Sequence, residues 1–310
     1  MVEENDIPIA VNINGIKMKT PVMTASGTFG YGSEYTDFVD LNQLGAIVVK
    51  GITNVPWTGN EMPRIAETPQ GMLNSIGLQN VGVERFIDEK LPYLRSFDVP
   101  VIVNVCGKME EEYIEVVEKL SEAGNIASIE LNISCPNLNC GGMSFGVDPN
   151  LTYQLVQRVR ERTDLPLLVK LSPNVTDVTE IAIAAEDAGA DGLSAINTLL
   201  GMGIDIKTRK PLIANMVAGL SGPAIKPVAL RVVWQVYNTV KIPIIGMGGI
   251  MTAEDAIEFF VAGASAVAVG TANFINPSAS IDIVAGIRKY LNQHQIGSLQ
   301  KLIGSLEVVA

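Results

Sequence analysis

Short apolar runs recur along the chain and alternate with longer segments whose apolar residues follow helical spacing. Eight runs have the length and continuous hydrophobicity of strands buried in a parallel sheet; they cover residues 21–25, 46–50, 100–105, 128–133, 166–171, 192–196, 243–247 and 264–269. Helical spacing is found between them, in residues 110–123, 150–162, 176–188, 224–237 and 253–262. Eight β-then-α units favour a (β/α)8 TIM barrel over an open doubly wound sheet.

Local signals complete the predicted architecture, which we interpret as a single domain spanning residues 1–310. Residues 9–19 alternate apolar and polar positions around Asn14-Gly15, which predicts a β-hairpin that caps the bottom of the barrel. Asp148 and Thr252 stand where helix N-caps are expected. Residues 51–82 and 197–222 lack a helical pattern, and structureless segments of that length are usually functional loops or lids.

Charge and composition exclude several classes of protein. The 33 acidic residues outnumber the 22 basic ones, the net charge is −11, and no basic block is present. Nucleic acid and anionic membranes are therefore not expected as partners. The first residues lack the pattern of a signal peptide, and no apolar run is long enough to cross a bilayer, so we expect a cytoplasmic protein.

The cysteines and the single histidine limit the chemistry further. Cys106, Cys135 and Cys140 are too few and too irregularly spaced for a disulfide framework or a paired metal site, so no metal is expected. His294 lies in a polar stretch near the C-terminus, where a solvated surface role is expected. A residue other than histidine must therefore move protons if the protein is an enzyme.

Polar residues follow most of the apolar runs, and in this fold the active site lies at the carboxyl ends of the strands. A single Asn or Ser at such a place is usually a turn residue, but here they recur around the barrel: Ser26, Lys50, Gly51, Asn104, Asn132, Lys170, Asn197 and Thr198. A lysine that ends a buried strand must bind an anion or form an ion pair. Lys50 and Lys170 are therefore the most informative of the set.

Glycine-rich segments follow the seventh and eighth strands. Gly246-Met247-Gly248-Gly249 and Gly270-Thr271-Ala272 each lead into a helix. Glycines there let backbone N–H groups approach an oxyanion, and the helix N-terminus favours negative charge. Tight turns would also explain either segment alone, but both together predict the phosphate site usual in phosphate-binding barrels.

Cys135 is the candidate base. Cysteine is often a small buried hydrophobe, which is the role we expect for Cys106, but Cys135 follows a strand end in a loop rich in Gly and Asn. An ordinary thiol pKa near ~8.5 needs only a modest local field to be poised near neutral pH. The glycines that follow predict that this loop moves over the site, and Cys140, in the same loop, is expected to be incidental.

With these residues placed, the chain closely resembles the dihydroorotate dehydrogenases of pyrimidine biosynthesis over nearly its whole length. The matching segments are Thr-Ala-Ser-Gly (24–27), Val-Lys-Gly (49–51), Asn-Ser-Ile-Gly-Leu-Gln-Asn (74–80), Glu-Leu-Asn-Ile-Ser-Cys-Pro-Asn (130–137), Val-Lys-Leu-Ser-Pro-Asn (169–174), Ile-Asn-Thr (196–198), Gly-Leu-Ser-Gly (219–222), Gly-Met-Gly-Gly (246–249) and Val-Gly-Thr-Ala (269–272).

The resemblance implies one FMN per chain and a set of residues around it. The phosphate would be held by Gly248, Gly249, Gly270 and Thr271, and the rest of the flavin by Ser26, Lys50, Gly51, Asn104, Asn132, Lys170, Ile196 and Gly222. Dihydroorotate would be held by Lys50, Asn74, Ser75, Ile76, Gly77, Leu78, Asn132, Asn197 and Thr198. Cys135 would remove the proton from C5 while a hydride passes from C6 to FMN, which gives orotate.

The resemblance also implies an electron acceptor. Family members with serine as base use quinone at membranes, whereas Cys135 places this chain with the cysteine class. The stretch 139–146 looks like the branch that pairs with an electron-transfer subunit carrying FAD and a [2Fe-2S] cluster and passes electrons to NAD+. That branch implies a heterotetramer of two catalytic and two electron-transfer chains, with the cluster on the partner because three scattered cysteines cannot ligate it.

Three other functions fit parts of the pattern. A homodimeric dihydroorotate dehydrogenase that reduces fumarate would have the same catalytic residues. A phosphate-binding aldolase or isomerase could use Lys170 as Schiff-base or general-base residue. A non-catalytic binding barrel would leave two buried lysines and the cysteine loop unexplained.

Overall fold

The barrel prediction is confirmed by a computed structural model, which describes residues 7–134 and 145–307. Eight parallel strands follow one another in the order β3-β16-β15-β10-β9-β8-β7-β4. A short bridge between Met23 and Ala46 brings β3 next to β4 and nearly closes the barrel. The barrel strands are β3 (Val22–Thr24), β4 (Ile47–Ile52), β7 (Val101–Val105), β8 (Ser128–Asn132), β9 (Leu167–Lys170), β10 (Gly192–Ala195), β15 (Ile244–Met247) and β16 (Ala266–Val269).

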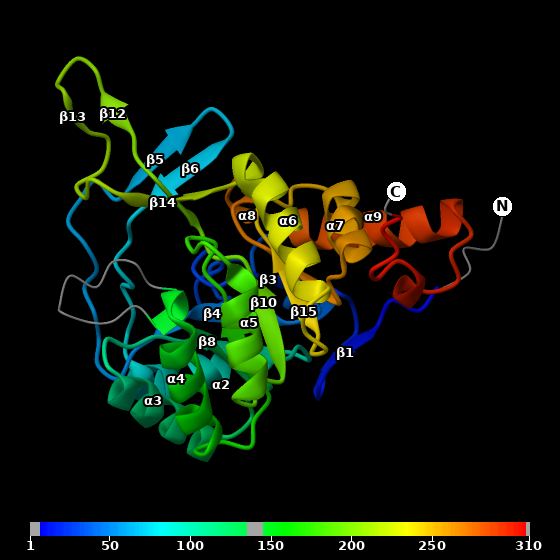
Figure 1. Cartoon of the computed structure of the whole chain (residues 1–310), viewed down its shortest axis with the longest axis horizontal. Coiled ribbons are helices and arrows are strands. Elements are labelled where there is room, and N and C mark those ends of the chain that lie inside the picture. The colour runs from blue at the N-terminus through cyan, green and yellow to red at the C-terminus, as the bar shows by residue number, and fades with distance from the viewer. Residues whose placement is uncertain (1–6, 135–144, 308–310) are drawn as a thin grey trace.

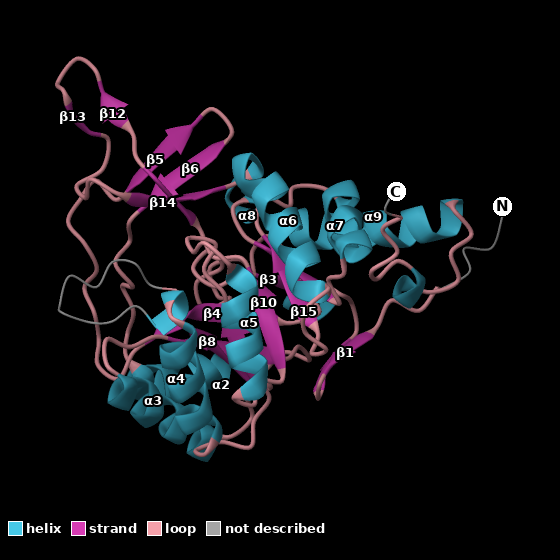
Figure 2. Cartoon of the chain, in the orientation of Figure 1, coloured by secondary structure: helices cyan, strands magenta, loops and turns pink. Residues whose placement is uncertain are grey.

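Helices surround the strands (Figure 2). They are α1 (Val83–Arg85), the π-helical turn η2 (Phe86–Lys90), α2 (Leu91–Leu94), α3 (Glu110–Ala123), α4 (Pro149–Arg160), α5 (Val178–Asp187), α6 (Lys226–Tyr237), α7 (Ala253–Ala262), α8 (Ala272–Ile275) and α9 (Ala279–Gln293). The 3-10 turns are η1 (Leu41–Gln43), η3 (Phe145–Val147), η4 (Pro223–Ile225) and η5 (Leu299–Lys301). From α3 to α7, each helix packs against the next along the chain.

Both predicted helix caps are confirmed, but one predicted β-then-α unit differs. Asp148 accepts hydrogen bonds from the backbone of Asn150 and Leu151, and Thr252 forms a capping box with Asp255. The prediction of eight β-then-α units is wrong for the first unit, because only η1 and turns connect β3 to β4. Two backbone hydrogen bonds close the seam between β3 and β4: the Gly45 N–H donates to the carbonyl of Val22, and the Thr24 N–H donates to the carbonyl of Ala46.

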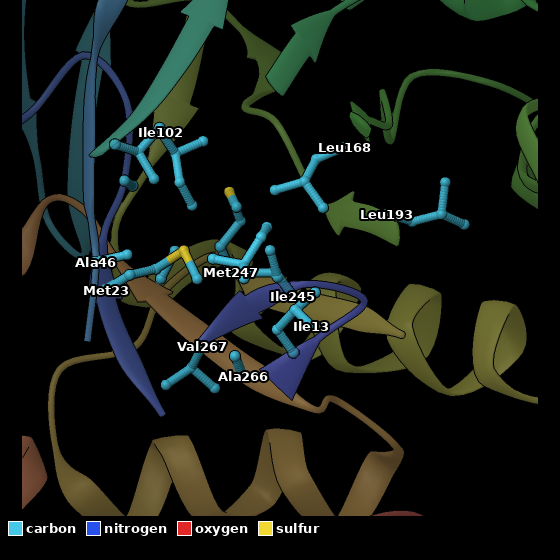
Figure 3. Close-up of a cluster of buried hydrophobic side chains, with 14 of the residues drawn as sticks. Ile13, Met23, Ala46, Ile102, Leu168, Leu193, Ile245, Met247, Ala266 and Val267 are labelled. Atoms are coloured by element: carbon cyan, nitrogen blue, oxygen red, sulfur yellow. The ribbon is translucent and has the colours of Figure 1, made fainter. Parts of the chain in front are cut away.

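The N-terminal hairpin lies at the amino ends of the barrel strands, as predicted. β1 (Val11–Ile13) pairs with β2 (Ile16–Met18) through a two-residue turn in which Asn14 and Gly15 have φ of 41° and 104°. Those positive values are the conformation that an Asn-Gly hairpin turn requires. The Asn14 amide donates to the carbonyl of Asp191, directly before β10. Figure 3 shows Ile13 among the core side chains of the barrel strands, so the hairpin closes the bottom of the core.

The two long segments predicted to lack structure contain strands, so that prediction is wrong. β11 (Leu199–Gly201), β14 (Ala218–Ser221), β6 (Gly71–Asn74) and β5 (Ile65–Thr68) form an antiparallel sheet in that order, and β12 (Ile204–Asp205) pairs with β13 (Lys210–Pro211). Figure 1 shows this small sheet and hairpin projecting together away from β1. Since β5 and β6 follow β4 while β11 and β14 follow β10, the sheet stands over the carboxyl ends of the barrel strands.

In the part of the chain that the structure describes, no helix is both long and apolar enough to pass through a membrane. His294 is exposed beside Tyr290, as expected, and Cys106 is fully buried at the end of β7.

Candidate active site

A cavity of about 440 Å³ opens at the carboxyl ends of the barrel strands, beneath the small sheet. Its walls combine apolar surface with a few polar groups, the usual character of a cofactor or substrate site. It brings together most of the residues that the sequence singled out: Ser26, Lys50, Gly51, Asn74, Ile76, Gly77, Leu78, Asn132, Lys170, Ile196, Asn197, Thr198, Gly222, Gly248, Gly249, Gly270 and Thr271.

Two predicted site residues are placed differently, and a third lies outside the described residues. Asn104 and Ser75 are 1% and 2% exposed and lie behind the lining residues, where they contact other side chains instead of the cavity. Cys135, like Cys140, lies outside the described residues. The chain just before it is described: Ser134 is buried and donates a hydrogen bond to the carbonyl of Lys170. Residue 135 therefore follows a segment that is anchored next to the cavity.

Lys170 ends β9 inside the barrel. Its Nζ donates to Ser26 Oγ at 3.0 Å and lies 4.0 Å from the carboxylate of Glu130 on β8. Both members of this pair are almost fully buried, which satisfies the requirement that a lysine at a strand end be paired. Lys170 also lines the cavity, so the same cation is available to an anionic ligand.

Lys50 lies on β4 and is half-buried, whereas Lys170 is almost fully buried. Burial lowers the pKa of Lys50 below its ordinary value, nearby Arg64 lowers it further, and Glu34 partly opposes both effects. Among the described residues, no carboxylate forms an ion pair with Lys50. Lys50 and Arg64 both line the cavity, and neither forms an ion pair with a described residue, so together they make a site suited to a carboxylate or phosphate.

The backbone near Gly248 and Gly249 forms a cradle in the cavity wall. Their φ values of 123° and 79° favour glycine, and a Cβ on Gly249 would lie 2.9 Å from the backbone of both Gly222 and Lys226. Across the cavity mouth, Thr271 Oγ1 donates to Ser221 Oγ at 2.9 Å and ties the end of β16 to β14. Only glycine fits at Gly249, and both glycines line the cavity, where their backbone can approach the phosphate of a nucleotide cofactor.

Residues 74–78 form a braced edge of the cavity. Gly77 and Leu78 have positive φ, and the Ser75 hydroxyl accepts hydrogen bonds from the amides of Asn60 at 2.9 Å and Asn215 at 2.7 Å. The backbone N–H of Asn60 and the Arg64 guanidinium donate to the carbonyl of Ile76. Ser75 therefore fixes the shape of this edge, while Asn74 and residues 76–78 face the cavity.

Amide side chains line the floor. Asn197 Nδ2 donates to Asn132 Oδ1 at 3.3 Å, and Asn132 Nδ2 approaches Asn104 Oδ1 at 3.5 Å. The Tyr113 hydroxyl donates to the backbone carbonyl of Asn132 and holds the end of β8 in place. Such a row offers both donors and acceptors, which suits a ring that carries amide groups along its edges.

Sequence reasoning missed several residues of this site, of which Arg64 and Glu130 carry charge. Arg64 lines the cavity beside Lys50, but lies in a segment that gave no strand pattern. Glu130 was visible as a carboxylate in the middle of an apolar run, a signal that could have marked it. The described residues contain no cluster of His, Cys, Asp or Glu that could hold a metal ion.

Comparison with known proteins gives a consistent result. The family model described as dihydroorotate dehydrogenase matches residues 8–291. A protein of Alkaliphilus metalliredigens is 59% identical over 300 residues, which cover 97% of this chain and 99% of that protein. One from Geotalea uraniireducens is 59% identical over 298 residues, covering 96% and 98%. Both are named dihydroorotate dehydrogenase B (NAD(+)), catalytic subunit.

Proposed function

This chain belongs to the dihydroorotate dehydrogenase family, and from that premise we propose that it oxidises dihydroorotate to orotate with FMN as its bound electron acceptor. The observation that carries the proposal is that one cavity brings together the glycine cradle, the row of amides and Lys50, which forms no ion pair with a described residue. These three features match, in order, a cofactor phosphate, a substrate carboxylate and a substrate ring.

The residues present fit FMN. The cradle at Gly248 and Gly249, with Gly270 and Thr271 on the neighbouring strand end, would hold the phosphate. Apolar side chains between the cradle and the floor, such as Ile196 and Met247, offer a surface for a flat ring. Lys170 would stand beside that ring and stabilise the negative charge that it gains on reduction.

The substrate would bind between Lys50 and the amide row. Lys50 would hold the carboxylate by a charge-assisted hydrogen bond. Asn74, Asn132, Asn197 and Thr198 would hold the ring amides, and the braced edge at residues 76–78 would close the pocket. These contacts fix which face of the ring is presented for reaction.

The reaction then needs a base and a hydride acceptor. We propose that the Cys135 thiolate takes the proton from C5 as the hydride leaves C6, so that the electron pair of the broken C5–H bond forms the C5=C6 double bond of orotate while the C6–H pair leaves with the hydride. FMN, when bound, supplies the hydride acceptor. The hydrogen bond from Ser134 to Lys170 places the start of the cysteine segment beside the cavity, which supports this role.

We further propose that electrons leave through a partner subunit with FAD and a [2Fe-2S] cluster to NAD+, in a cytoplasmic heterotetramer of two chains of each kind. The names of the relatives, which specify NAD(+) and a catalytic subunit, support this proposal over fumarate as acceptor. An aldolase or isomerase is disfavoured because Lys170 is held in an ion pair and family membership points to oxidoreduction.

The purified protein is expected to be yellow and to release FMN on denaturation, and anaerobic dihydroorotate is expected to bleach it. Gly249→Ala is expected to lose most of its FMN, because the new Cβ, at a φ of 79°, would lie 2.9 Å from the backbone of Gly222 and of Lys226 and force the cradle to shift. Gly297→Ala is the matched control, since Gly297 is exposed and a Cβ there meets only a lysine terminus at 3.9 Å. A colourless, folded wild-type protein that takes up no flavin would refute the proposal.

Co-expression with an FAD and iron-sulfur subunit is expected to confer NAD+ reduction by dihydroorotate. The measurement is the initial rate with NAD+ and with fumarate, for the chain alone and for the complex. Rates with fumarate that exceed those with NAD+ in both preparations would assign the chain to the homodimeric branch.

A further inference from the structure

Glu130 is a buried carboxylate that the proposed proton and hydride transfers do not use. It lies in the middle of β8 and is 1% exposed. In the sheet register it stands opposite Asn104 on β7, and Asn132, two residues further along β8, faces the cavity. A carboxylate at such a position is costly to bury unless each oxygen is satisfied.

Each carboxylate oxygen of Glu130 accepts a hydrogen bond, and the two donors lie on different strands. Oε1 accepts a hydrogen bond from Asn104 Nδ2 at 2.6 Å, and Oε2 accepts one from Ser194 Oγ on β10 at 2.7 Å. Oε1 also lies 4.0 Å from Lys170 Nζ on β9. One carboxylate on β8 thus contacts side chains from three other strands, β7, β9 and β10, and two of the residues it contacts, Asn104 and Lys170, are proposed flavin neighbours.

The charges of Glu130 and Lys170 oppose each other near the proposed flavin ring. Lys170 alone would favour a negative charge on the cofactor and so raise its reduction potential. A carboxylate 4.0 Å from that cation offsets much of its field, and the offset is large because the pair is shielded from water. Lys170 Nζ also donates a hydrogen bond to Ser26 Oγ at 3.0 Å, so the ammonium group has a second partner besides Glu130.

We propose that Glu130 is a positioning residue that holds Asn104 and Lys170 in place and, through its charge, keeps the reduction potential of bound FMN low. The inference rests on the proposed function, because it presupposes that FMN occupies the cavity. A low FMN potential would serve that function. NAD+ is a weak oxidant, so reduced FMN passes electrons toward it readily only when the reduction potential of FMN is low.

The test is the midpoint potential of bound FMN in the Glu130→Gln variant of the FMN-loaded protein, measured by redox titration. Glutamine keeps the shape and can still accept from Asn104, while the Ser194 hydroxyl can reverse to accept from its amide. Removing the charge is expected to shift the oxidised-to-reduced equilibrium at least tenfold toward reduction, which is about 30 mV for two electrons. Ser194→Ala keeps both charges and is expected to leave the equilibrium within threefold of wild type.

An equal potential in Glu130→Gln and wild type would overturn the inference and leave the proposed function intact, whereas absence of FMN from wild type would refute the proposed function. A purely structural role would lower stability in both Glu130→Gln and Ser194→Ala without the directed shift. If Glu130→Gln does not fold, Lys170→Gln is compared with Lys170→Gln/Glu130→Gln. The double variant is expected to have the higher potential, and equal values would overturn the inference.

Discussion

Replacing Cys135 with serine is expected to slow the reduction of bound FMN by dihydroorotate by roughly 10²–10⁴-fold near neutral pH, the usual contribution of a general base. A hydroxyl ionises far less readily than a thiol, so the variant would lack a proton acceptor while keeping the shape of the site. FMN content and orotate affinity should stay close to those of wild type. The measurement is anaerobic stopped-flow reduction of the flavin.

Cys140→Ser is the matched control, because it makes the same change five residues further along the same segment. It is expected to leave the reduction rate within about twofold. The rate of Cys135→Ser should rise with pH more steeply than that of wild type at alkaline pH, since a weaker acid needs a higher pH to ionise. Unchanged kinetics in Cys135→Ser would assign the base to another residue.

Replacing Lys50 with methionine is expected to weaken orotate binding by roughly 100-fold, the effect of losing a charge-assisted hydrogen bond of about 2–3 kcal/mol. The proposal gives Lys50 the substrate carboxylate as its counter-ion, and the described residues provide no other. Lys241→Met, at an exposed lysine, is the matched control and should leave the affinity unchanged. The measurement is equilibrium titration of the flavin absorbance with orotate.

The pKa of Lys50 predicts how this binding depends on pH. Lys50 carries its charge below its pKa, and burial lowers that pKa from the ordinary 10.5. Orotate affinity should therefore hold at neutral pH and fall as pH rises through the lowered pKa, earlier than for an exposed lysine. Lys50→Met should show no such fall. A fall of the same size and midpoint in Lys50→Met would mean that another group titrates.

The barrel strands could be predicted because both of their faces are buried, which makes each one a continuous apolar run. The small sheet could not, because its strands are three or four residues long and only partly buried. Its pairing also joins distant parts of the chain: Asn74 lies opposite Gly219. No local pattern records a contact of that separation.

The candidate site likewise contains residues that the sequence could identify and residues that it could not. Lys50 and Lys170 were recognisable because each ends an apolar run, where the fold places its chemistry. Arg64 reaches the cavity from the small sheet, so its position depends on the pairing that the sequence conceals. Ser75 was expected to bind substrate, but its hydroxyl accepts hydrogen bonds from Asn60 and from Asn215, a partner 140 residues away that no local pattern could indicate.

The antiparallel sheet above the cavity is assembled from two separate insertions in the barrel, one after β4 and one after β10. Each insertion contributes two strands that pair with each other, β5 with β6 and β11 with β14, and the pairing of β6 with β14 joins the two halves into one sheet. Anyone who transplants substrate preference from one relative to another would therefore have to move both insertions at once. A chimera that exchanges only one insertion would pair β6 and β14 from different relatives. The effects of exchanging the two insertions one at a time are therefore expected not to add up to the effect of exchanging both.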